Sequence, residues 1–265
     1  MSSFCSSLLV NPIANEPIVT AEKYMAYKKR NGHLIEFIPP AAILVCYQQS
    51  SLKYLLDCIP EMEECETFSN LYLIDEGRVG ILGGWGIGAP ALSVKLEQLI
   101  ALGAKTFIAV GTAGTLMNHP IGDFIIAPKA LAEDGVAHLY LKDSSFAQAD
   151  DALFSIWNSF IQSRSLPHFH SVPAWSFSAL FRETPADICR VTKLGCGVVE
   201  MEAATLYAIG QEKGVQTLSL FVVSDTLTQE NWIPHIKEPA VKHNLHRLAK
   251  WALEFCQETI LDKYI

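Results

Sequence analysis

The stretch GVVEMEAATLYAIG, residues 197–210, joins a short β-like run to a helix-like run. Between the two runs stand two carboxylates, Glu200 and Glu202, one on each side of Met201. A carboxylate beside the N-terminus of a helix is stabilised by the helix dipole, and this accounts for Glu200. Glu202 lies in the first turn among small apolar residues, where a buried carboxylate requires hydrogen-bond partners. The vicinal hydroxyls of a sugar would serve, because one carboxylate can accept a hydrogen bond from each of them.

Continuously apolar runs along the rest of the chain are typical of strands buried in the centre of a sheet. They alternate with helical patterns, which indicates an α/β fold with a central, mixed, twisted sheet flanked by helices. The expected strands are 41–47, 71–75, 79–84, 106–111, 123–128, 168–175 and 217–225, with 71–75 and 79–84 forming a hairpin. The expected helices are 24–30, 91–103, 151–163, one that begins at Thr184-Pro185, and about 235–261. We expect a single domain over residues 39–265, preceded by an N-terminal extension over residues 1–38.

The composition limits the classes of protein to consider. Of the 265 residues, 50% are hydrophobic, which is enough for a large core without disulfides or metals. The formal net charge of −8 argues against a nucleic-acid partner, whose footprint would be basic. Seven cysteines, with no Cys-x-x-Cys pair, favour reduced thiols, and no apolar run approaches the roughly 20 residues that span a bilayer. We therefore expect a cytoplasmic protein that binds neither nucleic acid nor membrane.

Three further segments place unusual residues at the carboxyl ends of expected strands, where open α/β sheets bind ligands. GGWGIGAP (83–90) presents glycine amides at the start of a helix, which suits an anion or a closely approaching ligand. VGTAGTL (110–116) offers two glycines and a threonine hydroxyl, and VVSDT (222–226) carries a serine and an aspartate. Each segment also has a plainer interpretation, as a tight turn, a strand-to-loop turn or an aspartate that caps the next segment. An aspartic acid in an apolar crevice can, however, serve as a general acid.

The histidines and serines form no recognisable metal or hydrolase motif. His243 and His246 stand at i, i+3, with His235 before them and no carboxylate at ligand spacing. We therefore expect solvated helix histidines and no metal site. No G-x-S-x-G elbow is present either, which argues against Ser-His-Asp hydrolysis.

Five segments, taken together and in this order, resemble the nucleoside phosphorylase and nucleosidase family. That family includes hexameric purine nucleoside phosphorylases, uridine phosphorylases and methylthioadenosine/S-adenosylhomocysteine nucleosidases. The matching segments are GWGIGAPAL (84–92), LGAKTFIAVGTAGTL (102–116), FRETP (181–185), VVEMEAATLY (198–207) and VVSDT (222–226). The V-E-M-E-A element is the most specific of them. The resemblance implies cleavage of the N-glycosidic bond of a nucleoside without a cofactor, with inorganic phosphate as a co-substrate if the reaction is phosphorolytic.

The resemblance also implies roles for individual residues. In that family the second glutamate of E-M-E binds the ribose 2′- and 3′-hydroxyls, which implies Glu202, and the methionine packs beneath the sugar, which implies Met201. The Ser-Asp pair handles the base in purine-type members, which implies Ser224 and Asp225. Asp225 would protonate or hydrogen-bond N7 of the base as the glycosidic bond breaks. Glu202 and Asp225 are therefore the predicted catalytic pair.

Further residues are implied around this pair. Thr112 in the G-T-A-G segment would lie beside the ribose and the phosphate, and Gly114 beside the base. The segment that holds Phe181 and Arg182 lines the base pocket in similar proteins. The amides near Gly86 would complete the place where the nucleophile binds.

The nucleophile side is where this chain departs from the family. Phosphorylases of this type have an arginine just before the V-G-T/S segment and another in a P-G-D-P-x-R-like loop, and these positions hold Ala109 and Ser51 here. Each charge-assisted hydrogen bond to an anion contributes about 1.5–3 kcal/mol, so the loss of two would weaken phosphate binding by on the order of a hundredfold or more. Hydrolytic nucleosidases in the family also lack these arginines and use water.

Three hypotheses follow, with phosphorolysis first. The chain is a nucleoside phosphorylase that holds phosphate through other donors, a nucleosidase that uses water, or a catalytically weak member that binds a nucleoside as a sensor or structural subunit. The base stays open, because Ser224-Asp225 indicates a purine and Arg182 indicates a pyrimidine-type pocket. The resemblance further implies a homo-oligomer, either a dimer or a trimer of dimers.

Overall fold

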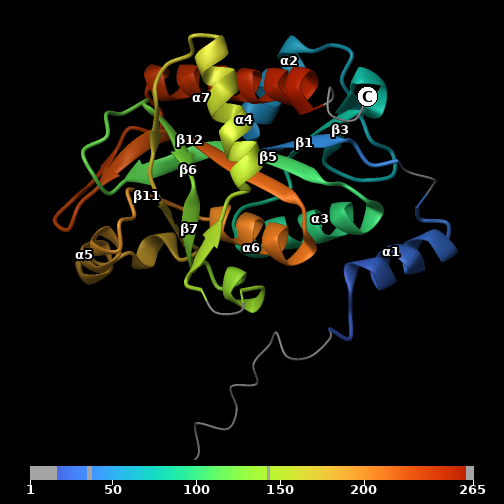
Figure 1. The fold of residues 1–265 in the computed structure, drawn as a ribbon, viewed down its shortest axis with the longest axis horizontal. Coiled ribbons are helices and arrows are strands. Elements are labelled where there is room, and N and C mark those ends of the chain that lie inside the picture. The colour runs from blue at the N-terminus through green and yellow to red at the C-terminus, as the bar shows by residue number, and fades with distance from the viewer. Residues whose placement is uncertain (1–16, 35–37, 142–143, 261–265) are drawn as a thin grey trace, which may run out of the picture.

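The computed structural model describes residues 17–34, 38–141 and 144–260. Figure 1 shows a large sheet running through the middle of the molecule, with helices on both of its faces. Strands pair in both directions within this sheet, so the expected mixed α/β architecture is confirmed. Of the predicted extension over residues 1–38, the structure describes 17–34 and 38, which include a helix over Ala21–Arg30, and the remainder lies outside the described residues.

Four parallel strands form the centre of the sheet. In spatial order they are β4 (Val79–Gly83), β1 (Ala42–Cys46), β5 (Thr106–Thr115) and β12 (Gln216–Leu227). Their side chains are almost all buried, because helices cover both faces, and this explains their continuously apolar sequences. Since the four strands run in the same direction, their carboxyl ends meet at one edge of the sheet, where ligands bind in open α/β folds.

Shorter strands extend this centre on both sides. β12 is antiparallel to β6, while β5 is antiparallel to β11, which leads on through β10 and β7 to β8. The shorter strands are β2 (Glu63–Glu64), β3 (Leu71–Ile74), β6 (Phe124–Ala127), β7 (Lys129–Glu133), β8 (Phe146–Gln148), β9 (Phe169–Ser171), β10 (Ala174–Phe177), β11 (Val198–Glu200) and β13 (Trp232–Pro234).

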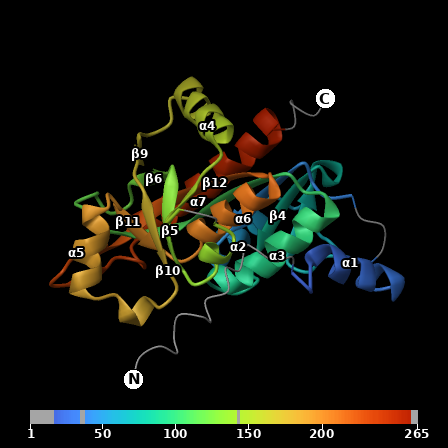
Figure 2. The ribbon, with the colours of Figure 1, turned by 60° about the horizontal axis from the view of Figure 1, so that its bottom comes forward.

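The helices form two layers. In Figures 1 and 2, α2, α4 and α7 lie over one face of the sheet and α3 and α6 over the other, with α1 packed outside α3. Their bounds are α1 (Ala21–Arg30), α2 (Gln49–Cys58), α3 (Ala89–Leu102), α4 (Asp151–Ser163), α5 (Pro185–Lys193), α6 (Ala203–Lys213) and α7 (Pro239–Phe255). No helix in the described ranges is both long enough and apolar enough to cross a membrane.

Local sequence signals account for several boundaries. β3 and β4 form the expected hairpin, closed by a short 3-10 turn over Asp75–Gly77. α3 ends at Gly103, whose φ of 115° lies in the left-handed region that favours glycine. α5 begins at Pro185 and is preceded by a capping box between Thr184 and Asp187.

Other boundaries differ from the expectation. The strand predicted to end at residue 111 continues to Thr115, because Gly111 and Gly114 lie inside β5 and not in a loop after it. The strand predicted to end at Asp225 continues to Leu227, with a bulge between Val223 and Asp225. The segment 168–175 forms two strands, β9 and β10, and the last helix starts at residue 239 and not 235.

The sequence interpretation also missed α2. Its apolar positions, Leu52 and Leu55, are buried three residues apart, but two serines and a lysine between Gln49 and Leu55 hide this pattern. As a result Ser51 lies inside a helix that packs against α7 and has no access to solvent.

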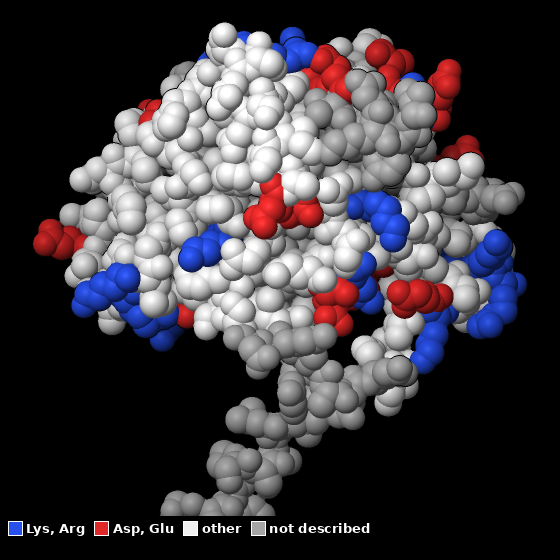
Figure 3. Space-filling view, viewed as in Figure 1, with Lys and Arg blue, Asp and Glu red and all other residues white. Residues whose placement is uncertain are grey.

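The surface view in Figure 3 shows basic and acidic side chains in small separate groups on one face, with uncharged surface between them. The described cysteines, Cys46, Cys58, Cys65, Cys189, Cys196 and Cys256, are all free, as the sequence predicted.

Gly210 allows α6 to approach the sheet closely. A Cβ at this position would lie 2.7 Å from Thr217 Cγ2 and 2.8 Å from Thr217 Oγ1. We expect Gly210→Ala to lower the free energy of unfolding by about 1–3 kcal/mol, because the overlap outweighs the better helix propensity of alanine. Urea denaturation measures the change. Gly210→Ala in a Thr217→Ala background, which removes both contacting atoms, should cost less, and a Gly210→Ala variant more stable than wild type would contradict this packing.

Candidate functional site

Most of the predicted site residues lie in β5 and β12, just after β11, or in the loop after β4, while Phe181 and Arg182 lie elsewhere. In the strand register, Val199 of β11 lies opposite Gly114 of β5, and Asp225 of β12 lies beside Gly114 on the other side. Glu200 follows Val199, so Glu200, Gly114 and Asp225 lie across adjacent strands. Glu202, two residues further on, begins α6. The sheet therefore brings the E-M-E segment and the S-D segment together at one place.

Glu200 is a structural residue, as the sequence predicted. Its Oε2 accepts hydrogen bonds from the backbone N–H groups of Glu202 and Ala203, at 2.8 and 2.7 Å, at the start of α6. Its Oε1 accepts a hydrogen bond from the hydroxyl of Ser176. Burial, and then the neighbouring Glu202 carboxyl, raise the pKa of Glu200 above its ordinary value, and these hydrogen bonds oppose the rise. Because both oxygens have partners inside the protein, Glu200 positions the turn and leaves ligand contact to Glu202.

Glu202 is buried, with 7% of its surface exposed. Its Oε1 accepts a hydrogen bond of 2.6 Å from the backbone N–H of Gly88, while no hydrogen bond to Oε2 is found among the described residues. Burial raises the pKa of Glu202 to about 7, and the hydrogen bond from Gly88 partly opposes this rise. Met201 lies beside the same loop, since a Cβ on Gly88 would be 4.0 Å from Met201 Cε. One carboxylate oxygen is thus held by the Gly88 N–H, and the predicted ligand contact of the other stays a prediction.

Gly86 and Gly88 both have positive φ, at 124° and 84°. A side chain would be strained in this region, which explains the alternate glycines of the G-x-G-x-G segment. The loop therefore directs its Gly88 N–H toward Glu202, and this N–H is no longer free to bind an anion because it holds the carboxylate.

Asp225 has a hydrogen bond at each carboxylate oxygen. Ser224 Oγ donates to Oδ1 at 2.6 Å, and the indole Nε1 of Trp232 donates to Oδ2 at 2.8 Å. Gly114 faces the same carboxylate, because a Cβ there would lie 2.8 Å from Asp225 Oδ2. The absence of a side chain at Gly114 is what allows Asp225 to lie against β5.

Glu183 was given no role in the sequence interpretation, although it lies within the FRETP segment (181–185). Burial and then the neighbouring Asp225 carboxylate raise the pKa of Glu183 to about 7. Glu183 immediately precedes Thr184, the cap of α5. Its proximity to Asp225 is a feature of the tertiary structure, because the two residues are far apart in the sequence.

Phe181 and Arg182, by contrast, lie on the surface. They belong to a short 3-10 turn, and Phe181 is 95% exposed. The side chain of Arg182 makes no hydrogen bond or ion pair within the described ranges. Their predicted role in binding the base stays a prediction.

Tyr47 and Gln48, which follow β1, lie beside Thr112, where the nucleophile is predicted to bind. Gln48 Nε2 donates a hydrogen bond of 3.0 Å to Thr112 Oγ1. The Tyr47 ring lies over Gly111, where an added Cβ would be 2.8 Å from Tyr47 Cδ2. Burial raises the pKa of Tyr47, and the nearby Glu200 and Glu202 carboxyls raise it further. Side chains of this chain therefore fill the space beside Thr112.

The donors available to an anion at this place are neutral. Within the described ranges, no lysine or arginine forms an ion pair with Glu202, Asp225 or Glu183. Three buried polar atoms near β1 and the glycine loop lack a partner in the described structure: Tyr47 OH, Gln48 Oε1 and Trp85 Nε1. Ser51 Oγ is also buried without a partner. This mixture of donors and an acceptor suits a neutral hydrogen-bonding group better than a phosphate dianion.

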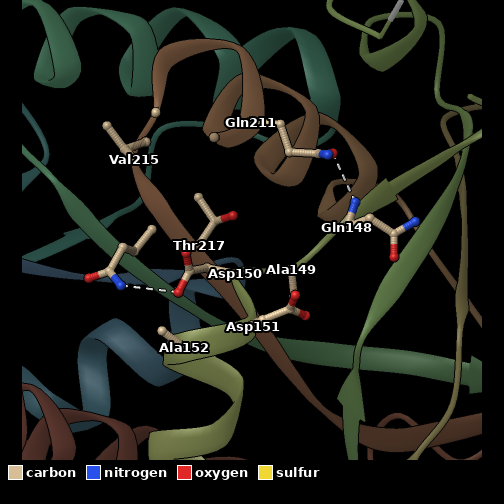
Figure 4. A pocket seen from close by; sticks show the side chains of 11 residues that line it. Gln148, Ala149, Asp150, Asp151, Ala152, Gln211, Val215 and Thr217 are labelled. Atoms are coloured by element: carbon tan, nitrogen blue, oxygen red, sulfur yellow. Dashed lines mark hydrogen bonds between the residues drawn. The ribbon is translucent and has the colours of Figure 1, made fainter. Parts of the chain in front are cut away.

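Two other features lie apart from these residues. Figure 4 shows a pocket of about 520 Å³ at the opposite end of β12, lined by Gln148, Asp150, Gln211 and Thr217 among others. It contains none of the predicted site residues. The histidines of α7 are not all solvated as expected, because the His246 ring stacks on Tyr54 at 4.1 Å between centroids.

Comparison with known proteins identifies the family. A model of the phosphorylase superfamily matches residues 49–257. The chain belongs to this superfamily. Curated relatives include purine nucleoside phosphorylases of Plasmodium falciparum (29% identical) and Plasmodium vivax (25% identical), each over 214 residues that make up 77% of this chain and 87% of the relative. A DeoD-type purine nucleoside phosphorylase of Lactococcus lactis is 34% identical over 151 residues, or 56% of this chain and 63% of the relative.

Solved structures show the same fold. A purine nucleoside phosphorylase from Toxoplasma gondii in complex with immucillin-H has a TM-score of 0.74 at 17% identity and covers 85% of this chain and 93% of its own. A methylthioadenosine/S-adenosylhomocysteine nucleosidase from Campylobacter jejuni has a TM-score of 0.69 at 16% identity, covering 83% and 99%. At these identities the likeness establishes the fold, which phosphorylases and nucleosidases share.

The buried Glu202 carboxyl should make stability depend on pH. Its pKa is raised from 4.5 to about 7, so between these values the folded protein binds more protons than the unfolded chain. The stability contribution of Glu202 therefore falls as pH rises through this range. We expect Glu202→Gln to gain about 1–3 kcal/mol relative to wild type between pH 5 and pH 8, since glutamine does not ionise.

Urea denaturation of both proteins at the two pH values measures this difference. Glu212→Gln is the matched control, because Glu212 is exposed on the same helix. An equal pH dependence in wild type and Glu202→Gln would show that Glu202 is not desolvated as described.

Proposed function

We propose that this chain cleaves the N-glycosidic bond of a nucleoside. The observation that carries the proposal concerns two carboxylates: Asp225 lies against Gly114, and Glu202 follows β11, the strand on the other side of Gly114, with no hydrogen bond to its Oε2 among the described residues. The superfamily acts on small-molecule nucleosides, and relatives named purine nucleoside phosphorylase align over 77% of the chain.

The two carboxylates divide the work of bond cleavage. As the bond from C1′ to the base breaks, its electron pair leaves with the base and positive charge develops on the sugar ring. Glu202 Oε2 accepts hydrogen bonds from the ribose 2′- and 3′-hydroxyls and holds the sugar, with Met201 beneath it. Asp225 donates a proton or a hydrogen bond to N7 of the departing purine, which stabilises the negative charge there. A nucleophile then bonds to C1′.

Phosphate is the first candidate nucleophile, because the curated relatives are named as phosphorylases. The products would be the free base and ribose 1-phosphate. The Thr112 hydroxyl and amides near Gly86 are the groups that would bind phosphate in this chain. Neither is charged, so phosphate would be held by neutral donors alone.

Water is the second candidate, and a specific observation favours it. Tyr47 and Gln48 lie where an anion would approach Thr112, while Ala109 and Ser51 are both buried and carry no charge. The unpartnered Gln48 Oε1 is an acceptor, which would attract a water molecule and repel a phosphate oxygen. The products would then be the free base and ribose.

We also propose a homo-oligomer in the cytoplasm. Apolar side chains around the site, such as Ile87 and Phe181, are exposed in the single chain and could be covered by a second copy. A catalytically weak nucleoside-binding protein is the further alternative, and the presence of both carboxylates supports an enzyme over it.

One assay separates the two nucleophiles. The protein is incubated with adenosine, guanosine, inosine and uridine, with and without inorganic phosphate, and the sugar product is identified. Ribose 1-phosphate formed only with phosphate supports phosphorolysis, and ribose formed at an unchanged rate without phosphate supports hydrolysis. Binding without turnover of any nucleoside would leave the non-catalytic alternative.

Asp225→Asn should depress turnover of a purine nucleoside far more than its binding. An amide cannot donate the same proton, and the loss of a positioned general acid lowers kcat by about 10²–10⁴-fold. Steady-state kinetics measure kcat, and calorimetric titration measures the Kd of the substrate. Asp151→Asn, an exposed change in α4, is the control. Equal turnover in Asp225→Asn and wild type would remove Asp225 from the mechanism.

A further inference from the structure

Trp232 contacts Asp225 from a separate element. It begins β13, which pairs antiparallel with β12 so that Leu227 lies opposite Trp232 and Asp225 lies opposite Pro234. The indole therefore extends along the hairpin, past Leu227, so that its Nε1 donates a hydrogen bond of 2.8 Å to Asp225 Oδ2. The tip of the hairpin is fixed by Thr228, whose Oγ1 accepts hydrogen bonds from the N–H groups of Glu230 and Asn231. The hairpin, whose tip is held by these hydrogen bonds, thus places the indole beside one oxygen of Asp225.

The indole is not placed there by burial. Trp232 is 56% exposed, and Ile233, beside it, is exposed as well. A large aromatic side chain that only filled the core would be covered on all sides, as Trp175 is. Among the described residues, the side chain of Trp232 makes one hydrogen bond, from its Nε1 to Asp225 Oδ2, and this bond constrains the orientation of the ring.

The two donors on Asp225 fix the plane of its carboxylate. Ser224 holds Oδ1 from within β12, and Trp232 holds Oδ2 from β13. Oδ2 is also the oxygen that faces Gly114, where no side chain blocks the approach of a base. A carboxylate held at both oxygens cannot rotate freely, so the oxygen directed at the base keeps its position.

We propose that Trp232 is a positioning residue for the glycosidic cleavage, and that it acts through its N–H bond to Asp225. The inference rests on the proposed function, in which Asp225 meets the departing base. Trp232→Phe keeps an aromatic ring, removes the N–H donor and makes the side chain smaller. A hydrogen bond to a charged group typically contributes a factor of about ten to a hundred, and this is the expected loss in kcat, with KM changed less.

The kinetic test is a double-mutant cycle in the full-length protein. Wild type, Trp232→Phe, Asp225→Asn and the double variant are compared for kcat and KM with a nucleoside that wild type cleaves. Because Trp232 acts through Asp225, we expect Trp232→Phe to have less than a twofold effect in the Asp225→Asn background. Trp251→Phe, in which the ring packs on Phe124 away from Asp225, is the matched control and should leave kcat unchanged. An undiminished kcat in Trp232→Phe, or full additivity in the cycle, would overturn the proposal.

A second measurement does not depend on turnover. With ¹⁵N-labelled tryptophan, the five tryptophans of the chain give five indole N–H resonances, and the one missing in Trp232→Phe belongs to Trp232. That resonance should move in Asp225→Asn more than the other four do. A Trp232 resonance unaffected by Asp225→Asn would show that the contact does not exist in solution, and would also overturn the proposal.

The same four proteins separate failure of this inference from failure of the proposed function. If wild type cleaves nucleosides and Trp232→Phe cleaves them equally well, only the role of Trp232 falls. If wild type cleaves none, the proposed function falls, and the role of Trp232 in cleavage falls with it, whatever the indole resonance shows.

Discussion

The hydrogen bond from the Gly88 N–H to Glu202 Oε1 is the contact on which the site depends. It joins segments 114 positions apart in the chain, the glycine loop after β4 and the start of α6. Without it, Glu202 would be a desolvated carboxylate with no partner, which is costly. With it, one oxygen is satisfied, and the second is the one that we propose meets the ribose. The glycines of the loop are required because the loop must bring a backbone N–H, and not a side chain, to the carboxylate.

Glu200 makes this arrangement possible. A helix start presents free N–H groups, and Glu200 accepts two of them while also bonding Ser176. Glu202 is therefore not needed as the cap of α6 and can turn toward the glycine loop. The two glutamates of E-M-E thus have separate hydrogen-bond partners although they are two residues apart. The Gly88 N–H, by holding the Glu202 carboxylate, would preorganise the proposed contact with the sugar.

The sequence predicted the parts of the fold and site that local patterns encode. Continuous apolar runs located β1 and β12, and Thr184-Pro185 located the start of α5, because burial on both faces and helix capping each constrain adjacent residues. The ends of β5 and β12 were wrong because glycine and polar residues inside a strand resemble a loop until the partner strand is known. The raised pKa of Glu183 could not be predicted, since it depends on burial and on Asp225, which is far from Glu183 in the sequence. Trp232 lies only seven positions from Asp225, yet their contact depends on the geometry of a hairpin that the sequence did not reveal.

The residues around Ala109 and Thr112 show that this part of the chain departs from the family pattern in more than the two missing arginines. Ala109 lies in register between Val45 of β1 and Ser219 of β12, and none of the three is exposed to solvent. An arginine there would have to bury a guanidinium, which requires an anion beside it. In this chain Tyr47 covers the neighbouring Gly111 instead, and Gln48 bonds Thr112. The half of the site that would bind sugar and base keeps its carboxylates, while the half that would bind the nucleophile is packed with neutral groups. In the proposed reaction, the choice between water and phosphate would therefore depend on Tyr47 and Gln48 as much as on the absence of charge at Ala109 and Ser51.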